Sequence, residues 1–139
     1  MVSYQPLLYS FLVSGVYLLI ISAVAAVIER RANLLRPLPD DQVEPIGVGW
    51  FVVNFIMELL FYVVIPAFAY SFFYLVLPVS GVRAGMAVAL VAFTLGAVPL
   101  VMSLSVRVRL PMPYLLFLLL TYIIKIGGSL ILIGLLYSL

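Results

Sequence analysis

One acidic and one basic residue stand within otherwise apolar stretches of this sequence. Glu58 lies in "NFIMELLFYVVIP", residues 54–66, and Lys125 lies in "TYIIKIGG", residues 121–128. A charged residue near the centre of a bilayer costs about 2.5–3.5 kcal/mol on insertion scales, so such residues pair with one another or mark a pathway for ions or protons. Glu58 and Lys125 are therefore the first candidates for chemistry in this chain.

Hydrogen-bonding residues accompany both charges at helical spacing. A step of four residues turns an α-helix by about 400°, so Asn54, Glu58 and Tyr62 share one face. Pro66 follows four residues later and cannot donate to the carbonyl of Tyr62, which predicts a kink in this helix. Thr121 and Ser129 lie one turn to either side of Lys125, and Tyr122 adds another hydroxyl group. The predicted site residues are Asn54, Glu58, Tyr62, Thr121, Tyr122, Lys125 and Ser129.

Two functional interpretations of these residues stay open. In the first, the pair lies in a wet cavity and binds or translocates a small solute, an ion or a proton. In the alternative, the chain is an accessory or assembly subunit of a larger membrane complex, and Glu58 and Lys125 form a structural ion pair that fixes which helices meet. We favour the first interpretation, because the neighbouring polar groups exceed what one ion pair requires.

The composition restricts the environment and the chemistry of the chain. Of its 139 residues, 67% are hydrophobic and 9% are charged, whereas soluble domains contain about 25% charged residues. The chain must therefore use lipid as its solvent. It contains no Cys and no His, which removes thiol chemistry and the commonest general base. We accordingly expect no metal site and no cofactor, and favour a non-enzymatic role. The scattered basic residues and a net charge of +2 give no reason to expect a nucleic-acid partner.

The length of the apolar stretches predicts four membrane-spanning helices. A spanning helix needs about 20 mostly apolar residues, and the stretches at about 5–28, 49–77, 81–104 and 112–138 qualify. Each must be helical, because lipid cannot satisfy exposed backbone polar groups. The sequence therefore predicts an all-α integral membrane protein, a compact four-helix bundle forming a single transmembrane domain over residues 1–139, with a polar loop at 29–48. The beginning of this loop is expected to extend the first helix by a turn or two, before Pro37 and Pro39 end regular helix.

The first apolar stretch has an alternative interpretation as a cleaved signal peptide. "SAVAA" offers an Ala-Val-Ala cleavage site at residues 23–25. However, no Lys or Arg precedes Glu29 and the apolar run is long, which favours a retained helix.

The distribution of Arg residues predicts the orientation of the bundle. The 29–48 loop carries Arg30, Arg31 and Arg36, and the 104–111 loop carries Arg107 and Arg109, whereas the opposite side carries only Arg83. Because basic residues are enriched in cytoplasmic loops, both of these loops are expected in the cytoplasm and both termini outside. We expect the membrane to be the cytoplasmic membrane of a prokaryote.

This orientation allows the depths of the two charges to be compared. Glu58 lies eight residues past Trp50 and Lys125 eleven past Tyr114, about 12 Å and 16 Å along helices that run in the same direction. A Lys side chain is long enough to bend back by this difference in depth. The second and fourth helices are therefore predicted to face each other through Glu58 and Lys125.

Small residues indicate where helices pack closely. In the third apolar stretch they recur on one helical face, at Gly81, Gly85, Ala89, Ala92 and Gly96. Small residues let helix backbones approach one another in lipid, where hydrophobicity alone does not hold helices together. This face is predicted to pack against a neighbouring helix or a second protomer, so the expected partners are the lipid bilayer and either a homo-oligomer or a larger membrane complex. The first stretch has a weaker face of this kind, which includes Ser14, Ser22 and Ala26.

Overall fold

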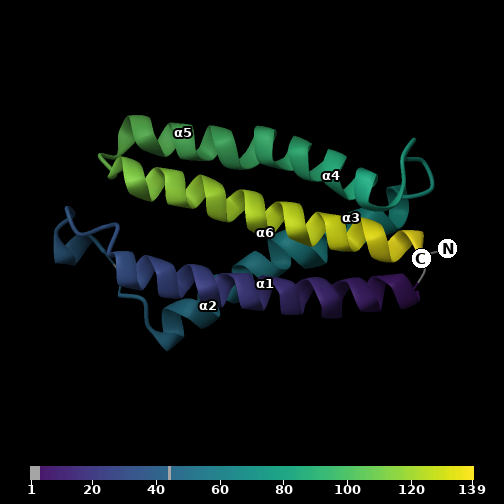
Figure 1. Cartoon of the computed structure of the whole chain (residues 1–139), viewed down its shortest axis with the longest axis horizontal. Coiled ribbons are helices and arrows are strands. Elements are labelled where there is room, and N and C mark those ends of the chain that lie inside the picture. Colours follow the sequence, from purple (N-terminus) through teal and green to yellow (C-terminus); the bar gives the residue numbers. More distant parts are fainter. Residues whose placement is uncertain (1–3, 44) are drawn as a thin grey trace.

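Four long helical spans make up most of the computed structural model, which describes residues 4–43 and 45–139 (Figure 1). The first span is α1 (Tyr4–Ala32), and a short 3₁₀ helix, η1 (Asp40–Gln42), lies in the connection that follows it. The second span consists of α2 (Val48–Leu59), the π-helical turn η2 (Leu60–Val64) and α3 (Ile65–Phe73). The third consists of α4 (Gly81–Ala92), the π-helical turn η3 (Phe93–Ala97) and α5 (Val98–Arg107), and the fourth is α6 (Met112–Ser138).

All four spans are long and apolar enough to cross a membrane, and the described residues form no strand. These findings confirm the prediction of an all-helical protein with four membrane-length helices. They indicate an integral membrane protein, because helices with this many lipid-compatible side chains on their outer faces need an apolar solvent.

One span boundary differs from its predicted position. The α-helix of the second span ends at Phe73, not at residue 77, and residues 74–76 form turns that lead to Pro78. The N–H groups of Val76 and Leu77 both donate to the carbonyl of Phe73, at 3.0 and 3.2 Å, and Pro78 has no N–H with which to continue the helix. The first helix continues past residue 28 to Ala32, within the predicted extension, and is followed by Asn33 with a φ of 47°, a left-handed conformation that Asn tolerates at a helix end.

The second and third spans are built in the same way. In each, a 12-residue α-helix is followed by a five-residue π-helical turn, and a Pro occupies the second position of the next helix. In the second span the N–H of Ile65 donates to the carbonyl of Leu60, five residues earlier. The π-helical turn thus pairs backbone groups just before Pro66, which has no N–H to donate. The kink at Pro66 stays a prediction. What the structure shows is that the backbone hydrogen bonds before Pro66 span five residues instead of the four of an α-helix.

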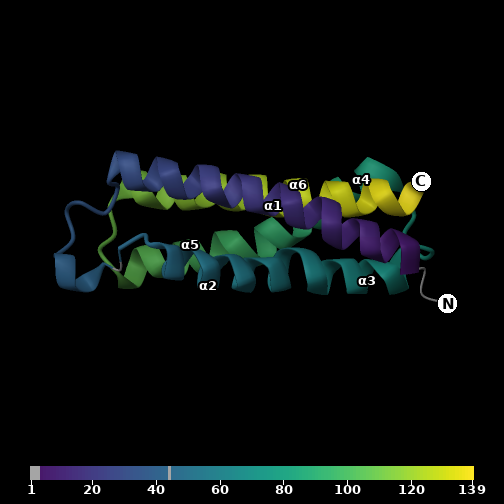
Figure 2. The ribbon, with the colours of Figure 1, turned by 90° about the horizontal axis from the view of Figure 1, so that it is seen from below.

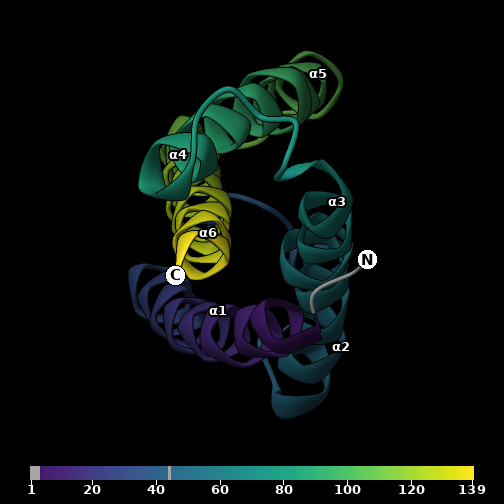
Figure 3. The same ribbon diagram turned by 90° about the vertical axis from the view of Figure 1, so that its right-hand side faces the viewer.

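In the end-on view of the bundle, the spans follow one another in the order second, first, fourth, third (Figure 3). Here α6 contacts every other span, whereas the third span contacts only α6 within the described part of the chain. Helices α1 and α6 run side by side along the molecule (Figure 2). The connections 33–47 and 108–111 lie at one end, which we call the loop end. The 74–80 connection, the beginning of α1 and the end of α6 lie at the other, which we call the terminal end (Figure 1).

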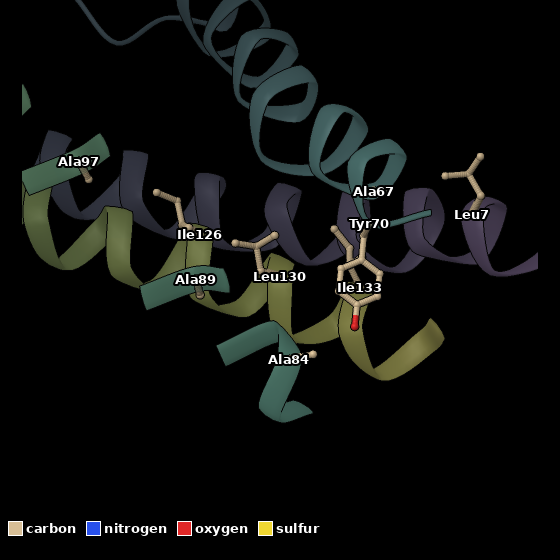
Figure 4. Close-up of a cluster of buried hydrophobic side chains, with 9 residues drawn as sticks. All are labelled: Leu7, Ala67, Tyr70, Ala84, Ala89, Ala97, Ile126, Leu130 and Ile133. Atoms are coloured by element: carbon tan, nitrogen blue, oxygen red, sulfur yellow. The ribbon is translucent and has the colours of Figure 1, made fainter. Parts of the chain in front are cut away.

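An apolar core extends from the middle of the bundle towards the terminal end (Figure 4). It is contributed by all four spans, and many of its members are small, so the helices approach closely there. The core residues are Leu7, Ala67, Tyr70, Ala84, Ala89, Ala97, Ile126, Leu130 and Ile133.

Helices α4 and α6 meet almost backbone to backbone. A Cβ atom on Gly85 would lie 2.5 Å from the carbonyl oxygen of Leu130 and 2.6 Å from Cα of Ile131. A Cβ atom on Gly134 would lie 2.6 Å from the carbonyl oxygen of Gly81. Both positions therefore require Gly.

The predicted small-residue face meets α6 along only part of its length. Ala89 is buried and Ala92 is half-buried, whereas Gly96 is exposed, and no atom lies within 4 Å of the position that a Cβ atom would take there. Gly81 begins α4 with a φ of 63°, a conformation that Gly adopts without strain. Gly134, on the opposite helix, was not singled out by the sequence pattern.

Helices α1 and α6 are joined by polar contacts. The missing side chain of Gly128 leaves the space in which the ring of Tyr17 lies, and the Tyr17 hydroxyl donates to the carbonyl of Ile124 at 2.8 Å. The hydroxyl of Ser14 donates to the carbonyl of Ser129 at 3.5 Å. Hydrogen bonds between helices hold such an interface in lipid.

Substitution Gly128→Ala tests this interface. Because the new methyl group would collide with the tip of the Tyr17 side chain, the ring must shift and its hydrogen bond to the Ile124 carbonyl is lost. We expect the free energy of unfolding to fall by about 0.5–1.5 kcal/mol, the net contribution of one hydrogen bond. Gly127→Ala is the matched control, since no atom lies within 4 Å of its Cβ position. Unfolding in detergent mixtures would measure both variants, and equal stability of the two would contradict the placement of Tyr17.

Candidate functional site

Glu58 and Lys125 form an ion pair within the bundle. The Lys125 Nζ lies 2.6 Å from Oε1 of Glu58, and the two side chains are only 7% and 12% exposed, respectively. The hydroxyl of Ser22 donates to Oε2 of the same carboxylate at 3.0 Å. Both carboxylate oxygens therefore receive a hydrogen bond, one of them charge-assisted, and the three groups come from α2, α6 and α1.

The pair lies near the middle of the spans. Lys125 is thirteen residues from each end of α6 (Met112–Ser138), which is about 20 Å at 1.5 Å per residue. At this depth water is excluded unless the protein itself provides space for it. The space around the pair thus decides whether water or a ligand can reach it.

A cavity of about 160 Å³ extends from the ion pair towards the loop end. On α1, Ser22, Ala25, Ala26 and Glu29 line it, and their spacing places them on one helical face. The two Ala residues fill little of the space between Ser22 and Glu29. The other walls are formed by α2 and α6, and their polar or aromatic members include Trp50, Asn54, Tyr114, Thr121 and Tyr122.

A wider hollow adjoins the cavity at the loop end. This second hollow has a volume of about 460 Å³ and is lined in part by Arg30, Asn33 and Gln42. Three residues line both spaces, namely Glu29, Trp50 and Tyr114. These three residues therefore stand between the ion-pair cavity and the loop end. Beyond the pair, towards the terminal end, lies the apolar core.

The structure brings together five of the seven predicted site residues. Asn54, Glu58, Thr121, Tyr122 and Lys125 all line the cavity. The hydroxyl of Thr121 donates to the carbonyl of Phe117 at 2.7 Å, so its proton is directed to its own helix.

The other two predicted residues, Tyr62 and Ser129, lie outside the cavity lining. The ring of Tyr62 packs edge-on against Tyr122, with centroids 6.5 Å apart, and lines an apolar groove of about 340 Å³ between the second and third spans. Ser129 is buried one turn beyond Lys125, where its carbonyl faces Ser14.

Three polar residues of the site were not predicted. Ser22 hydrogen-bonds to Glu58, and Glu29 and Tyr114 line both hollows. The spacing of seven residues between Ser22 and Glu29, two helical turns, could have placed these two on one face. The sequence pattern predicted a packing face for Ser22 and a polar loop for Glu29. No feature of the sequence indicated that either residue lies near the second or the fourth span.

The described residues contain no group of three or more Asp or Glu side chains placed to hold a metal ion. What the site offers is one compensated ion pair, one further carboxylate and several hydroxyl and amide groups around a small space. At about 30 Å³ per molecule, the inner cavity has room for about five water molecules.

Comparison with known proteins adds no relative from which a role could be carried over: no protein-family model, no curated protein sequence and no solved structure matches this chain.

Proposed function

We propose that this chain is a small, non-enzymatic membrane protein that binds or translocates a small solute, an ion or a proton at the cavity around Glu58 and Lys125. The observation that carries the proposal is the hollow beside the pair. Protein interiors are close-packed, with few voids larger than a water molecule. A pair that served only to align helices would need no polar cavity beside it.

The direction of access follows from the predicted orientation. The loop end carries Arg30, Arg31 and Arg36 on one connection and Arg107 and Arg109 on the other, which favours a cytoplasmic position for this end. The site would then open to the cytoplasm, with both termini outside, and the whole chain would act as one transmembrane domain in a prokaryotic cytoplasmic membrane.

A second candidate role, as a subunit of a homo-oligomer or of a larger membrane complex, is favoured by the third span. This span packs only on α6 within the described residues, and its remaining surface is exposed and apolar, including Leu90, Leu95 and Leu100. Gly96 lies on this exposed surface and would let another helix approach closely. Gentle extraction that yields only a monomer would remove this support.

Substitution Glu58→Gln tests the proposed function directly. The purified full-length protein would be placed in liposomes, and the fluxes of H⁺, Na⁺, K⁺ and Cl⁻ would be measured with ion-sensitive dyes. We expect flux of at least one of them above that of empty liposomes, and a fall of about tenfold or more in Glu58→Gln, because the charge that defines the site is lost.

Asp41→Asn is the matched control, since it also removes one carboxylate but lies in the connection outside both hollows. Its flux should equal that of the unsubstituted protein. Wild-type flux equal to that of empty liposomes for all four ions would overturn translocation of these ions and leave only a small solute as the ligand. Equal ion flux in Glu58→Gln and wild type would overturn the assignment of the site to Glu58.

A further inference from the structure

Glu29 is a second carboxylate between the ion pair and the loop end. It is half-buried, lines both the inner cavity and the outer hollow, and has no Lys or Arg nitrogen within 4 Å among the described residues. It lies seven residues from Ser22 on α1, or about 10 Å along the helix. Ser22 contacts Glu58, so the two carboxylates occupy opposite ends of the inner cavity.

The charges that line the inner cavity do not balance. Glu29 and Glu58 contribute two negative charges and Lys125 contributes one positive charge, which leaves a net charge of −1 when all three are ionised. An uncompensated charge in a poorly solvated space is costly. The cavity should therefore accept a cation in preference to an anion.

The arrangement of the oxygen atoms favours a proton over a metal cation. Hard cations such as Ca²⁺ take six or more oxygen ligands at one position, whereas here the carboxylates stand at opposite ends and no acidic cluster is present among the described residues. A proton needs one carboxylate at a time. The space for about five water molecules could connect the two groups.

We propose that the inner cavity binds one exchangeable proton, which is shared between Glu29 and Glu58 and reaches the solution at the loop end through Glu29. This inference rests on the proposed function and names its ligand. With the proton on Glu29, that side chain is a neutral carboxyl group and the Glu58–Lys125 pair is intact. With the proton on Glu58, Glu29 is the carboxylate and the Lys125 ammonium has lost its charged partner.

Both arrangements have the same net charge of zero, but the second one separates the Lys125 ammonium from its countercharge, so the first arrangement is the more stable one. Glu29 gives its proton to a cavity water, and a proton from the water chain binds the Glu58 carboxylate, while Lys125 keeps all of its own protons. In the second arrangement the ammonium group is attracted towards Glu29. Proton movement is thereby coupled to the position of the Lys125 side chain.

The other titratable groups around the inner cavity are tyrosines: Tyr114 and Tyr122 line it, and Tyr62 packs against Tyr122. Arg30 lines only the outer hollow and is exposed, so solvent screens its charge and the inner cavity keeps its imbalance. Tyrosine hydroxyls lose their protons far above the range of carboxyl groups. They can hydrogen-bond to water in the cavity but stay neutral while the carboxyl groups exchange.

Trp50 provides a direct test. It is the only Trp in the chain and lines the cavity together with Glu29, so its fluorescence should report the charge there. In the full-length protein we expect the Trp50 emission to change through a transition as pH is varied. Glu29→Gln should abolish this transition, whereas Asp41→Asn should retain it.

Glu58→Gln tests the sharing of the proton. In this variant Lys125 is left without its partner and the ionised cavity is already neutral, so the Trp50 transition should move to lower pH by about one unit, the effect of one opposite charge at about 10 Å. A transition that survives Glu29→Gln, or one that Glu58→Gln does not move, would overturn the shared-proton proposal.

The ion fluxes separate this inference from the proposed function. If the Glu58-dependent flux is carried by Na⁺, K⁺ or Cl⁻ and not by H⁺, the proton proposal fails while the proposed function stands. If an ion flux is present and does not depend on Glu58, the proposed function at this site fails. A Glu58-dependent H⁺ flux that Glu29→Gln lowers by about tenfold or more would support both.

Discussion

Gly85→Leu should destabilise the protein by about 3 kcal/mol or more, at the upper end of overpacking effects. Its Cβ position lies 2.5–2.6 Å from backbone atoms of Leu130 and Ile131, and backbone atoms of α6 cannot move aside as a side chain can. Helices α4 and α6 must therefore separate. Since the third span packs on no other span within the described residues, separation would loosen it along its length.

The effect would be measured as the free energy of unfolding in mixed detergent micelles, with helix content followed by circular dichroism. Gly96→Leu is the matched control, because it makes the same change in the same span at a position with no atom within 4 Å. We expect it to alter the stability of the monomer little. Equal destabilisation by the two substitutions would show that the α4–α6 contact is not the one described.

The same pair of variants also separates packing within one chain from packing between chains. Gly85 is buried against α6, whereas Gly96 is exposed. If Gly96→Leu leaves the monomer stable but removes a co-purifying protomer or partner, the exposed face of the third span is an interface between chains. The predicted small-residue face would then serve two contacts, one at each end.

The four spans could be predicted because length and apolarity alone identify a membrane helix. Helix ends could be predicted less closely because they depend on local backbone effects, as the end of α3 at Phe73 shows. The π-helical turns could not be specified, since Pro66 and Pro99 indicate only that a hydrogen bond is missing. Which carbonyls then pair is decided by the packing around each turn.

Part of the candidate site was also accessible from the sequence, by counting residues from the ends of the spans. That count put Glu58 and Lys125 within one helical turn of each other in depth, and the structure places their charged atoms 2.6 Å apart. The inward face of α1 could be predicted only in part. Three of its five buried residues are Ser10, Ser14 and Ser22, whereas its exposed residues are mostly apolar, and the small residues of this stretch indicated a packing face. Nothing in that pattern connected Ser22 to Glu58 or placed Glu29 beside the cavity.

Lys125→Met should destabilise the protein by about 3–5 kcal/mol, because it leaves the carboxylate of Glu58 buried without a countercharge. Only the Ser22 hydroxyl would still donate to it. Combined with Glu58→Gln, the same substitution should cost much less, since a neutral amide can keep a hydrogen bond with Ser22 and no charge remains unpaired. The two single variants and the double variant form a thermodynamic cycle, measured by unfolding in detergent micelles.

The coupling energy from this cycle decides how the pair contributes to the molecule. Because Lys125→Met alone should cost about 3–5 kcal/mol and the double variant much less, the coupling should lie at or above the upper end of the range of about 0.5–3 kcal/mol that is usual for residues in contact. Suppose that the double variant recovers stability, shows no ion flux and does not shift the pH of the Trp50 transition. The pair is then dispensable for folding but required for the function of the site. If the double variant is as stable as the wild type and conducts equally well, the pair is only a packing element, and the cavity beside it has no role in function.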